Sequence, residues 1–364
     1  MKKLLLAATV ATLAMNAAQA APTLYGKLSV TLDNIDNNGF KDESVTKVNS
    51  NASRIGVKGE EKLTDNLSAV YLAEWEISAD GDGDVFKNRN RFVGIKSNGV
   101  ATLKVGQYDS YFKTAAGNNQ DIFNDHNELD MTKVLVGEDR LTNVIGFETD
   151  KKLLGGLAFN IMFQQGEESE GANSKAKGYE GSRDGFGDGV SASLTYENKD
   201  MGLAAAVAAN RAIASKFNAY SDLTGIYTDA VRVTGSLDLG AMGASGLVLG
   251  ALWQTAQPTD DTVTVTKGTP AVVTSYKGLQ EDAFGVTAAY KIGATPVKLK
   301  AQYISATTEV DGMKDRQQDL YGVGADYQIN KQARFYGIVA QQKRDWLTKD
   351  DKKTNIGLGM EYNF

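Results

Sequence analysis

Three aspartates at alternate positions, in the stretch ADGDGDVF, have the spacing of metal ligands. Asp80, Asp82 and Asp84 match the first ligand positions of a calcium-binding EF-hand loop. A loop of that kind beginning at Asp80 needs glycine at its sixth position and glutamate at its twelfth, where this sequence has Val85 and Arg91. We therefore expect a solvated polar loop here, and neither a metal site nor a cofactor elsewhere.

The single histidine, His126, is the side chain best suited to acid–base chemistry near pH 7. No serine or cysteine nucleophile stands in a recognisable motif near it. A lipase or protease is the enzyme alternative, and hydrolysis that is lost in His126→Ala would identify it. The sequence favours a protein without enzymatic activity.

Four basic residues lie in strand-like stretches: Lys27, Arg54, Arg89 and Arg140. Arginine keeps its proton in essentially any surroundings, so a cluster of such residues makes a permanently positive surface. Opposed by carboxylates, that surface would produce an electric field that orients polar solutes and water. The elements that carry these residues decide whether they meet.

Apolar and polar residues alternate along most of the chain, which is the pattern of two-faced β-strands. Near the start, Leu24, Leu28 and Leu32 share one face, and Lys27 lies on the other. In residues 354–364 the even-numbered positions are mostly apolar and the odd-numbered ones are polar or glycine. Other stretches with this pattern are 55–58, 157–164, 284–290 and 297–303.

The connections between these stretches alternate in length. The short ones are 63–66, 97–99, 151–155, 198–201, 240–246, 293–296 and 330–332. The long ones are 34–51, 79–87, 108–138, 166–188, 212–222, 256–281, 307–317 and 345–352. Seven short and eight long connections join sixteen strands. An even number of antiparallel strands, with short turns at one end and long loops at the other, is typical of an outer-membrane barrel.

The last strand has the length that a bilayer requires. Eleven residues from Thr354 to Phe364, at ~3.3 Å each and tilted by ~45°, rise about 25 Å, the height of the apolar band. A soluble β-sandwich also alternates, but tyrosines near strand ends, such as Tyr303 and Tyr362, are typical of a membrane–water interface. Because a strand edge in lipid must be paired, we expect the first and last strands to close the cylinder.

Residues 1–20 have the basic start, apolar run and small-residue close of a secretory signal peptide. We expect cleavage after Ala20, with residues 21–364 forming one transmembrane barrel domain. The chain has no Cys and 4 Pro but 38 Gly, which suits many strands and tight turns. Its net charge of −6 argues against nucleic acid as a partner.

Over residues 21–364 the sequence closely resembles the Gram-negative general diffusion porins. The resemblance is carried by the order and spacing of TLYGKLSVTLDN, SRIGVKGEEKLTDNLSAVYLAEWE, RNRFVGIKSNGVATLKVGQYDS and the terminal aromatic of GMEYNF. It implies an all-β, multi-pass, sixteen-stranded antiparallel barrel of the outer membrane, with short periplasmic turns and long extracellular loops. It also implies a homotrimer, contacts with outer-membrane lipid and lipopolysaccharide, and assembly by the outer-membrane machinery with Phe364 as its recognition signal.

In that family the third long loop folds into the barrel and presents carboxylates to a basic wall. The matching wall positions are Lys27, Arg54, Arg89 and Arg140, with Arg91 on the same face as Arg89. The loop stretch NNQDIFNDHNELD offers Asp121 and Asp125 as the acids. Enterobacterial members have a Pro-Glu-Phe-Gly-Gly-Asp stretch that is missing here, so Glu128 and Asp130 stay alternatives.

The alternation of apolar and polar residues also predicts the direction of these wall residues, independently of the resemblance to porins. Lys27, Arg54 and Arg140 stand opposite the apolar stripes of their strands. Because a charge on the lipid face near mid-membrane costs ~2–4 kcal/mol, these three are expected inside. Arg89 is ambiguous, because the apolar Val93 shares its face.

We therefore expect a general diffusion porin, a water-filled channel for passive passage of ions and small hydrophilic solutes. The acidic chain predicts a mild preference for cations. A solute-selective outer-membrane channel, a loop-mediated adhesin or bacteriophage receptor, and an outer-membrane hydrolase are the alternatives. The second long loop, which latches onto a neighbouring subunit in the family, is short here.

Overall fold

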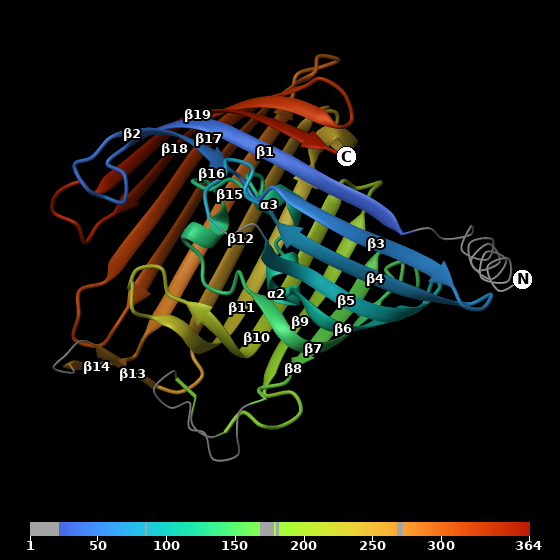
Figure 1. Cartoon of the computed structure of the whole chain (residues 1–364), viewed down its shortest axis with the longest axis horizontal. Coiled ribbons are helices and arrows are strands. Elements are labelled where there is room, and N and C mark those ends of the chain that lie inside the picture. Colours follow the sequence, from blue (N-terminus) through green and yellow to red (C-terminus); the bar gives the residue numbers. More distant parts are fainter. Residues whose placement is uncertain (1–21, 84–85, 168–177, 180–181, 268–271) are drawn as a thin grey trace, which may run out of the picture.

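The computed structural model describes residues 22–83, 86–167, 178–179, 182–267 and 272–364, which form a closed antiparallel β-barrel (Figure 1). The strands of the barrel wall are β1 (Thr23–Asp36), β2 (Val45–Ser50), β3 (Arg54–Lys62), β4 (Leu67–Glu76), β5 (Lys87–Ser97), β6 (Ala101–Asp109), β7 (Arg140–Thr149), β8 (Leu157–Gln164), β9 (Gly189–Asn198), β10 (Leu203–Lys216), β11 (Thr224–Asp238), β12 (Leu247–Pro258), β15 (Gln280–Lys291), β16 (Val297–Glu309), β17 (Arg316–Gln328), β18 (Ala333–Arg344) and β19 (Lys352–Asn363). The expected signal peptide, residues 1–20, lies outside the described residues, as do Asp84 and Val85.

The wall has sixteen strand positions around its circumference, as predicted, and each of these is called a stave here. Strands β2 and β3 are two halves of one stave, because β1 pairs with β2 along its later residues and with β3 along its first ones. Every other wall strand pairs with its neighbour along the chain, apart from β12, which pairs with β15. The fold class predicted from the alternation is confirmed.

Apolar side chains point outward and polar ones inward, which is the reverse of a water-soluble domain. Leu24 and Leu358 are 61% and 69% exposed, while Asp33 and Asn355 are 0% and 1% exposed. A bilayer would cover the outer band, and a wet lumen would receive the polar face. The predicted faces of the first and last strands are therefore confirmed.

The first and last strands close the barrel. β1 pairs with β19 in an antiparallel register from Lys27 opposite Asn363 to Asp36 opposite Thr354. Gly26 and Phe364 extend this ladder: each backbone N–H donates to the other's carbonyl, at 2.9 and 3.0 Å. The Phe364 ring lies where a side chain at Gly26 would project, so the glycine leaves room for it. The seam predicted from the sequence is confirmed.

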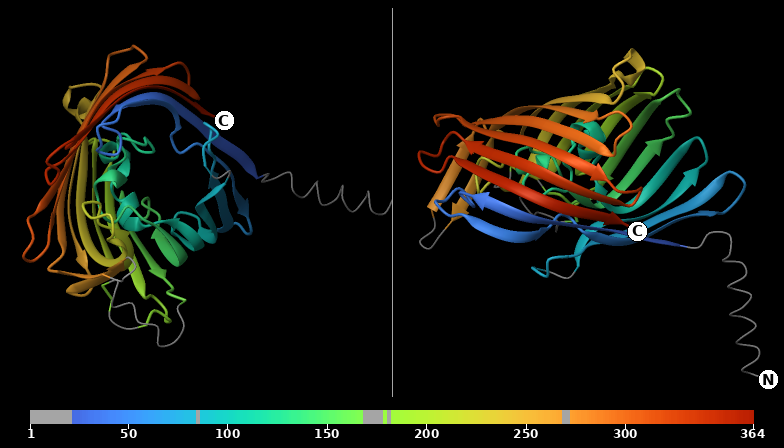
Figure 2. Two further views of the ribbon diagram at one scale, coloured as in Figure 1. Left: turned by 60° about the vertical axis from the view of Figure 1, so that its left-hand side comes forward. Right: turned by 90° about the horizontal axis from the view of Figure 1, so that it is seen from above.

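Short turns and the chain's C-terminal end lie at one end of the barrel, and the long loops lie at the other (Figure 2). Two predicted long loops contain strands. Residues 45–50 of the first form β2, because alternation there continues against β1, and the sixth contains the hairpin of β13 (Thr262–Lys267) and β14 (Val272–Lys277). The other connections fall within a few residues of the predicted positions.

None of the helices among the described residues is both long enough and apolar enough to span a bilayer. The small helical elements considered below belong to one long connection. They are α2 (Tyr111–Thr114), α3 (Gly117–Gln120) and the 3₁₀ turn η2 (Met131–Lys133).

These elements lie in residues 110–139, hereafter the third loop, which enters the lumen between β6 and β7 (Figure 2). Its apolar residues pack against the lumen face of the wall from β10 to β18: Phe112 and Val136 contact one cluster, and Phe123 and Leu129 contact another. On those strands, many lumen positions hold alanine or aliphatic residues such as Leu252. The loop therefore fills one side of the barrel and leaves the side lined by β3 to β7 open.

Candidate functional site: a charged constriction beside the third loop

The returning limb of the third loop is held by a buried arginine on β11. Arg232 is fully buried and its guanidinium forms an ion pair with Glu138. It also donates to the carbonyl of Phe112 at 3.3 Å and to Oε1 of Gln254 at 3.0 Å, and it lies 4.3 Å from the centre of the Phe112 ring. A buried guanidinium whose three nitrogens all have acceptors fixes both ends of the loop against the wall.

Sequence reasoning missed Arg232, although the signal was available. Arg232 stands between Val231 and Val233, which are exposed on the outer face. The alternation that put Lys27 and Arg54 inside would have put Arg232 there too.

The tip of the third loop, residues 126–128, contacts the wall at the interruption between β2 and β3. Between these strands the backbone departs from the ladder, with Ala52 at φ +47°. The backbone N–H of Asn127 donates to Oδ1 of Asn51 at 3.0 Å, and its side-chain amide donates to the carbonyl of Ser50 at 2.8 Å. The interruption thus supplies the acceptors that hold the tip across the lumen.

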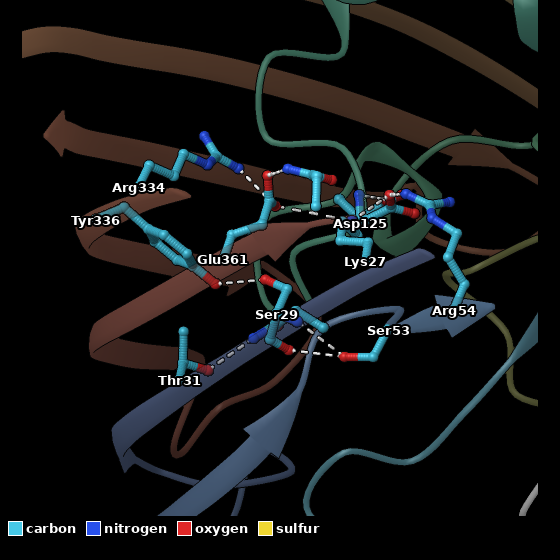
Figure 3. A network of polar contacts seen from close by, with 12 residues as sticks. Lys27, Ser29, Thr31, Ser53, Arg54, Asp125, Arg334, Tyr336 and Glu361 are labelled. Carbon is cyan, nitrogen blue, oxygen red and sulfur yellow. Dashed lines mark hydrogen bonds and ion pairs between the residues drawn. The ribbon is translucent and has the colours of Figure 1, made fainter. Parts of the chain in front are cut away.

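Asp125, beside that tip, meets three of the four predicted wall cations. Its carboxylate accepts from Nζ of Lys27 at 2.8 Å, forms an ion pair with Arg54, and lies 3.7 Å from Nη2 of Arg89. Figure 3 shows Asp125 between Lys27 and Arg54, with Glu361 on the far side of Lys27. Burial alone would raise the pKa of Asp125, but the charges of Lys27 and Arg54 hold it down to about 2.

Two wall carboxylates complete this cluster. Glu74 lies 2.6 Å from Nε of Arg89 and 3.9 Å from Nη1 of Arg54, and Glu76 lies 3.2 Å from Nη1 of Arg89. The hydroxyl of Tyr25 donates to Glu74 at 2.8 Å. The arginines are therefore held between acids of the loop and acids of the wall, which fixes their orientation.

Arg140 lies in the lumen but in a separate group. Its guanidinium is 3.1 Å from Asp109 and donates from Nε to Asn90 at 2.6 Å. Lys113, on the incoming limb of the loop, lies 3.3 Å from the same aspartate. The structure thus brings Lys27, Arg54 and Arg89 together around Asp125 and puts Arg140 beside Asp109.

The other loop acids have different positions. Asp121 forms no ion pair with the four wall cations in the described part of the chain, and burial together with the charge of Asp130 raises its pKa well above the usual value. Glu128 pairs with Lys353, and Asp130 accepts from the backbone N–H of Asp125 at 2.9 Å. Asp125 is thus the loop acid that contacts the wall cations predicted from the sequence, namely Lys27, Arg54 and Arg89.

Arg89 and Arg91 are separated by an irregularity in the ladder. The pairing of β4 with β5 shifts register between Ala73 and Trp75. This shift lets Arg89 turn to Glu74 in the lumen, whereas Arg91 keeps the other face and donates to Gln107 at 2.7 Å. The ambiguity left by the alternation at Arg89 comes from this bulge.

His126 belongs to the architecture of the tip. Its Nδ1 accepts from the backbone N–H of Glu128 at 3.2 Å, and its ring packs edge-on against Tyr336. Burial lowers the pKa of His126 to about 4, so the ring is neutral near pH 7. Asp80 likewise has a structural part, accepting from the hydroxyl of Ser78 in its own loop at 2.5 Å and from the backbone N–H of Ser50, at the end of β2, at 2.7 Å.

An open cavity of about 410 Å³ lies between the third loop and the wall of β3 to β7. Its lining is charged on all sides and contains few apolar groups. The basic residues in this lining are Arg54, Arg89, Lys113, Lys133 and Arg140, and the acidic ones are Glu74, Glu76, Asp109, Asp125 and Asp130. Equal numbers of opposite charges give a strong local field with little net charge.

Comparisons with known proteins agree with this geometry. The family model of the Gram-negative porins matches residues 6–346. Among curated proteins, the major outer membrane protein P.IB of Neisseria sicca is 26% identical, with both chains covered in full. Two similar solved structures are an anion-selective porin from Comamonas acidovorans, with a TM-score of 0.66 and 18% identity, and the trimer form of OmpT from Vibrio cholerae, with a TM-score of 0.64 and 17% identity. The first match covers 95% of this chain and 100% of the Comamonas porin, and the second covers 95% of this chain and 99% of OmpT.

Proposed function

Because the chain belongs to the Gram-negative porin family, we propose that it is a general diffusion porin of the outer membrane. The barrel leaves a charged passage between the third loop and the wall of β3 to β7, and ions and small hydrophilic solutes would cross it passively. The observation that carries this proposal is the cavity of about 410 Å³ left beside a loop that is clamped inside the barrel.

The constriction in this proposal is the passage between the loop and β3 to β7. Its basic wall is formed by Lys27, Arg54 and Arg89, with Arg140 further along, and Asp125 supplies the facing loop acid. Asp121 has a lesser part in the proposal, because it contacts none of these cations and its pKa is raised. A field between fixed charges orders water and favours solutes that can align with it, so apolar molecules are disfavoured.

Ion selectivity should be weak, because the lining of the passage is balanced in charge. The preference for cations is predicted from the charge of the whole chain, most of which lies outside the lining of this passage. It stays a prediction, and reversal potentials in a KCl gradient would measure it. A clear preference for anions would overturn it.

We also propose a homotrimer in contact with outer-membrane lipid and lipopolysaccharide. The similarity to the trimer form of OmpT supports the oligomeric state. In this proposal Phe364 is a signal for the outer-membrane assembly machinery, a role consistent with its position at the seam beside Gly26.

Reconstitution into planar bilayers tests the function directly. The protein should give steady ohmic conductance, and steps that come in groups of three would support the trimer. A correctly folded barrel that inserts into the bilayer without conducting would refute the proposal.

A further inference from the structure

A second cavity, of about 400 Å³, lies at the extracellular end of the lumen above the constriction. We call it the vestibule. It is enclosed by the first long loop at Phe40, by the returning limb of the third loop at Lys133, by the end of β10 at Lys216 and by the end of β18 at Arg344. Pockets of this size accommodate small organic molecules.

Three cations of the vestibule lack partners within the described part of the chain. Neither a carboxylate within 4.0 Å nor a side-chain hydrogen-bond acceptor is found there for Lys133, Lys216 or Arg344. The buried Nε of Arg344 is unsatisfied. This differs from the constriction, where each wall cation contacts an acid.

The guanidinium of Arg344 is held in place although no acid binds it. It stacks on the Phe40 ring at 4.1 Å and lies 5.5 Å from the Trp346 ring. Stacking on aromatic faces orients the donors of an arginine while leaving its edge free. A group held in advance loses less conformational entropy when a ligand binds.

The acids of the vestibule oppose these cations only weakly. Glu138 is already paired with Arg232. Asp139 accepts a hydrogen bond from the hydroxyl of Ser215, which occupies part of its carboxylate. Lys353 pairs with Glu128. The charge left for a solute is therefore positive.

We propose that the vestibule is a binding site for small anions that carry two or more carboxylate or phosphate groups. Such a ligand would supply acceptors for Lys133, Lys216 and Arg344 together. Thr132 and Lys133 also line the constriction cavity, so a bound anion would stand directly at its entrance. This inference rests on the proposed channel function and adds a solute class to it.

The experiment measures block of single-channel current by citrate or inorganic pyrophosphate, added on the side of the long loops in low KCl. We expect both probes to block, an uncharged sugar of similar size to have no effect, and high KCl to weaken the block by screening. Block by citrate alone or by pyrophosphate alone would assign the site to carboxylates or to phosphates.

The variant Lys216→Gln with Arg344→Gln should raise the half-blocking concentration about tenfold, since two charged contacts are lost. A matched control, Lys314→Gln with Lys349→Gln, removes the same charge from loop positions outside the vestibule lining and should be blocked like the unmodified protein. Equal block in both variants would overturn the site.

Failure of the site and failure of the channel are distinguishable. A protein that conducts but is blocked by neither probe refutes the vestibule site alone. A protein that does not conduct refutes the channel function, and calorimetric titration of the detergent-solubilised full-length protein with citrate then decides the site separately. Absence of measurable heat at millimolar citrate would overturn it.

Discussion

Replacing Asp125 by asparagine tests the electrostatics of the constriction. The substitution removes one negative charge from a lining with equal numbers of acids and bases, and it leaves Lys27, Arg54 and Arg89 without their loop acid. A unit charge about 7 Å away in water changes the energy of a monovalent ion by ~0.6 kcal/mol, which is about threefold in local ion concentration. Loss of the negative charge raises the local concentration of chloride and lowers that of potassium, so the chloride-to-potassium permeability ratio should rise several-fold.

The same substitution should loosen the tip of the loop. The pKa of Asp125 falls from an ordinary 3.8 to about 2, a difference equivalent to roughly 2 kcal/mol. Because this pKa is depressed, the stabilisation is present above pH 3.8 and is lost as the pH falls through about 2. The asparagine variant lacks it at neutral pH, so its open-channel current should be noisier. In the unmodified channel Asp125 stays ionised from pH 7 to pH 5, so it should contribute no change in selectivity over that range.

Reversal potentials in a KCl gradient, recorded for both proteins at neutral pH, measure the effect. Asp121→Asn is the matched control, because it removes an acid from the same loop that contacts none of the wall cations and whose pKa is already raised. The reasoning is wrong if Asp121→Asn changes the permeability ratio as much as Asp125→Asn does. It is also wrong if Asp125→Asn leaves the ratio unchanged.

Three further substitutions test other parts of the structure. Arg54→Ser with Arg89→Ser should widen the passage and raise the preference for cations, because two positive charges leave its lining; unchanged sugar uptake and reversal potentials would mean that neither residue lines it. Arg232→Met leaves Glu138 buried without its cation, which should cost about 3–5 kcal/mol and lower the melting temperature of the folded barrel measured by circular dichroism; an unaltered melting temperature would contradict this. Phe364→Ala should reduce the yield of membrane-inserted barrel while the conductance of assembled channels stays normal; full yield would show that the ring is dispensable.

The barrel itself could be predicted from the sequence because lipid imposes one rule on every second residue. Leu358 and Asn355 could be assigned to opposite faces without any knowledge of their neighbours, and the structure agrees. The number of staves followed from the alternation of short and long connections. A local sequence pattern is enough to predict the structure where successive strand residues alternate between lipid and lumen.

The path of the third loop could not be predicted in the same way. Asp121 and Asp125 are both acids on a polar stretch, and their spacing does not tell which one reaches the wall. The answer depends on Asn127, which binds acceptors that exist only because the stave of β2 and β3 is interrupted. Those contacts join residues more than seventy positions apart, and no local pattern records them.

Arg89 shows a further limit. Its face could not be assigned because alternation assumes an uninterrupted ladder, and the register shift opposite Glu74 breaks that assumption. The pattern predicts Arg91 on the same face as Arg89, but the shift separates them: Arg89 turns to Glu74 in the lumen, and Arg91 contacts Gln107 on the other face. A bulge of this kind is visible only when the partner strand is known.

The returning half of the third loop is anchored to the wall along its length. One anchor is the Arg232–Glu138 pair, another is Asn127 against the interrupted stave, and between them wall glutamines donate to loop carbonyls. Residues inserted between these anchors cannot lie flat against the wall, so they should bulge into the open side of the lumen. The bore of the channel is therefore a property of chain length: insertions there should narrow it stepwise, and deletions should break anchors.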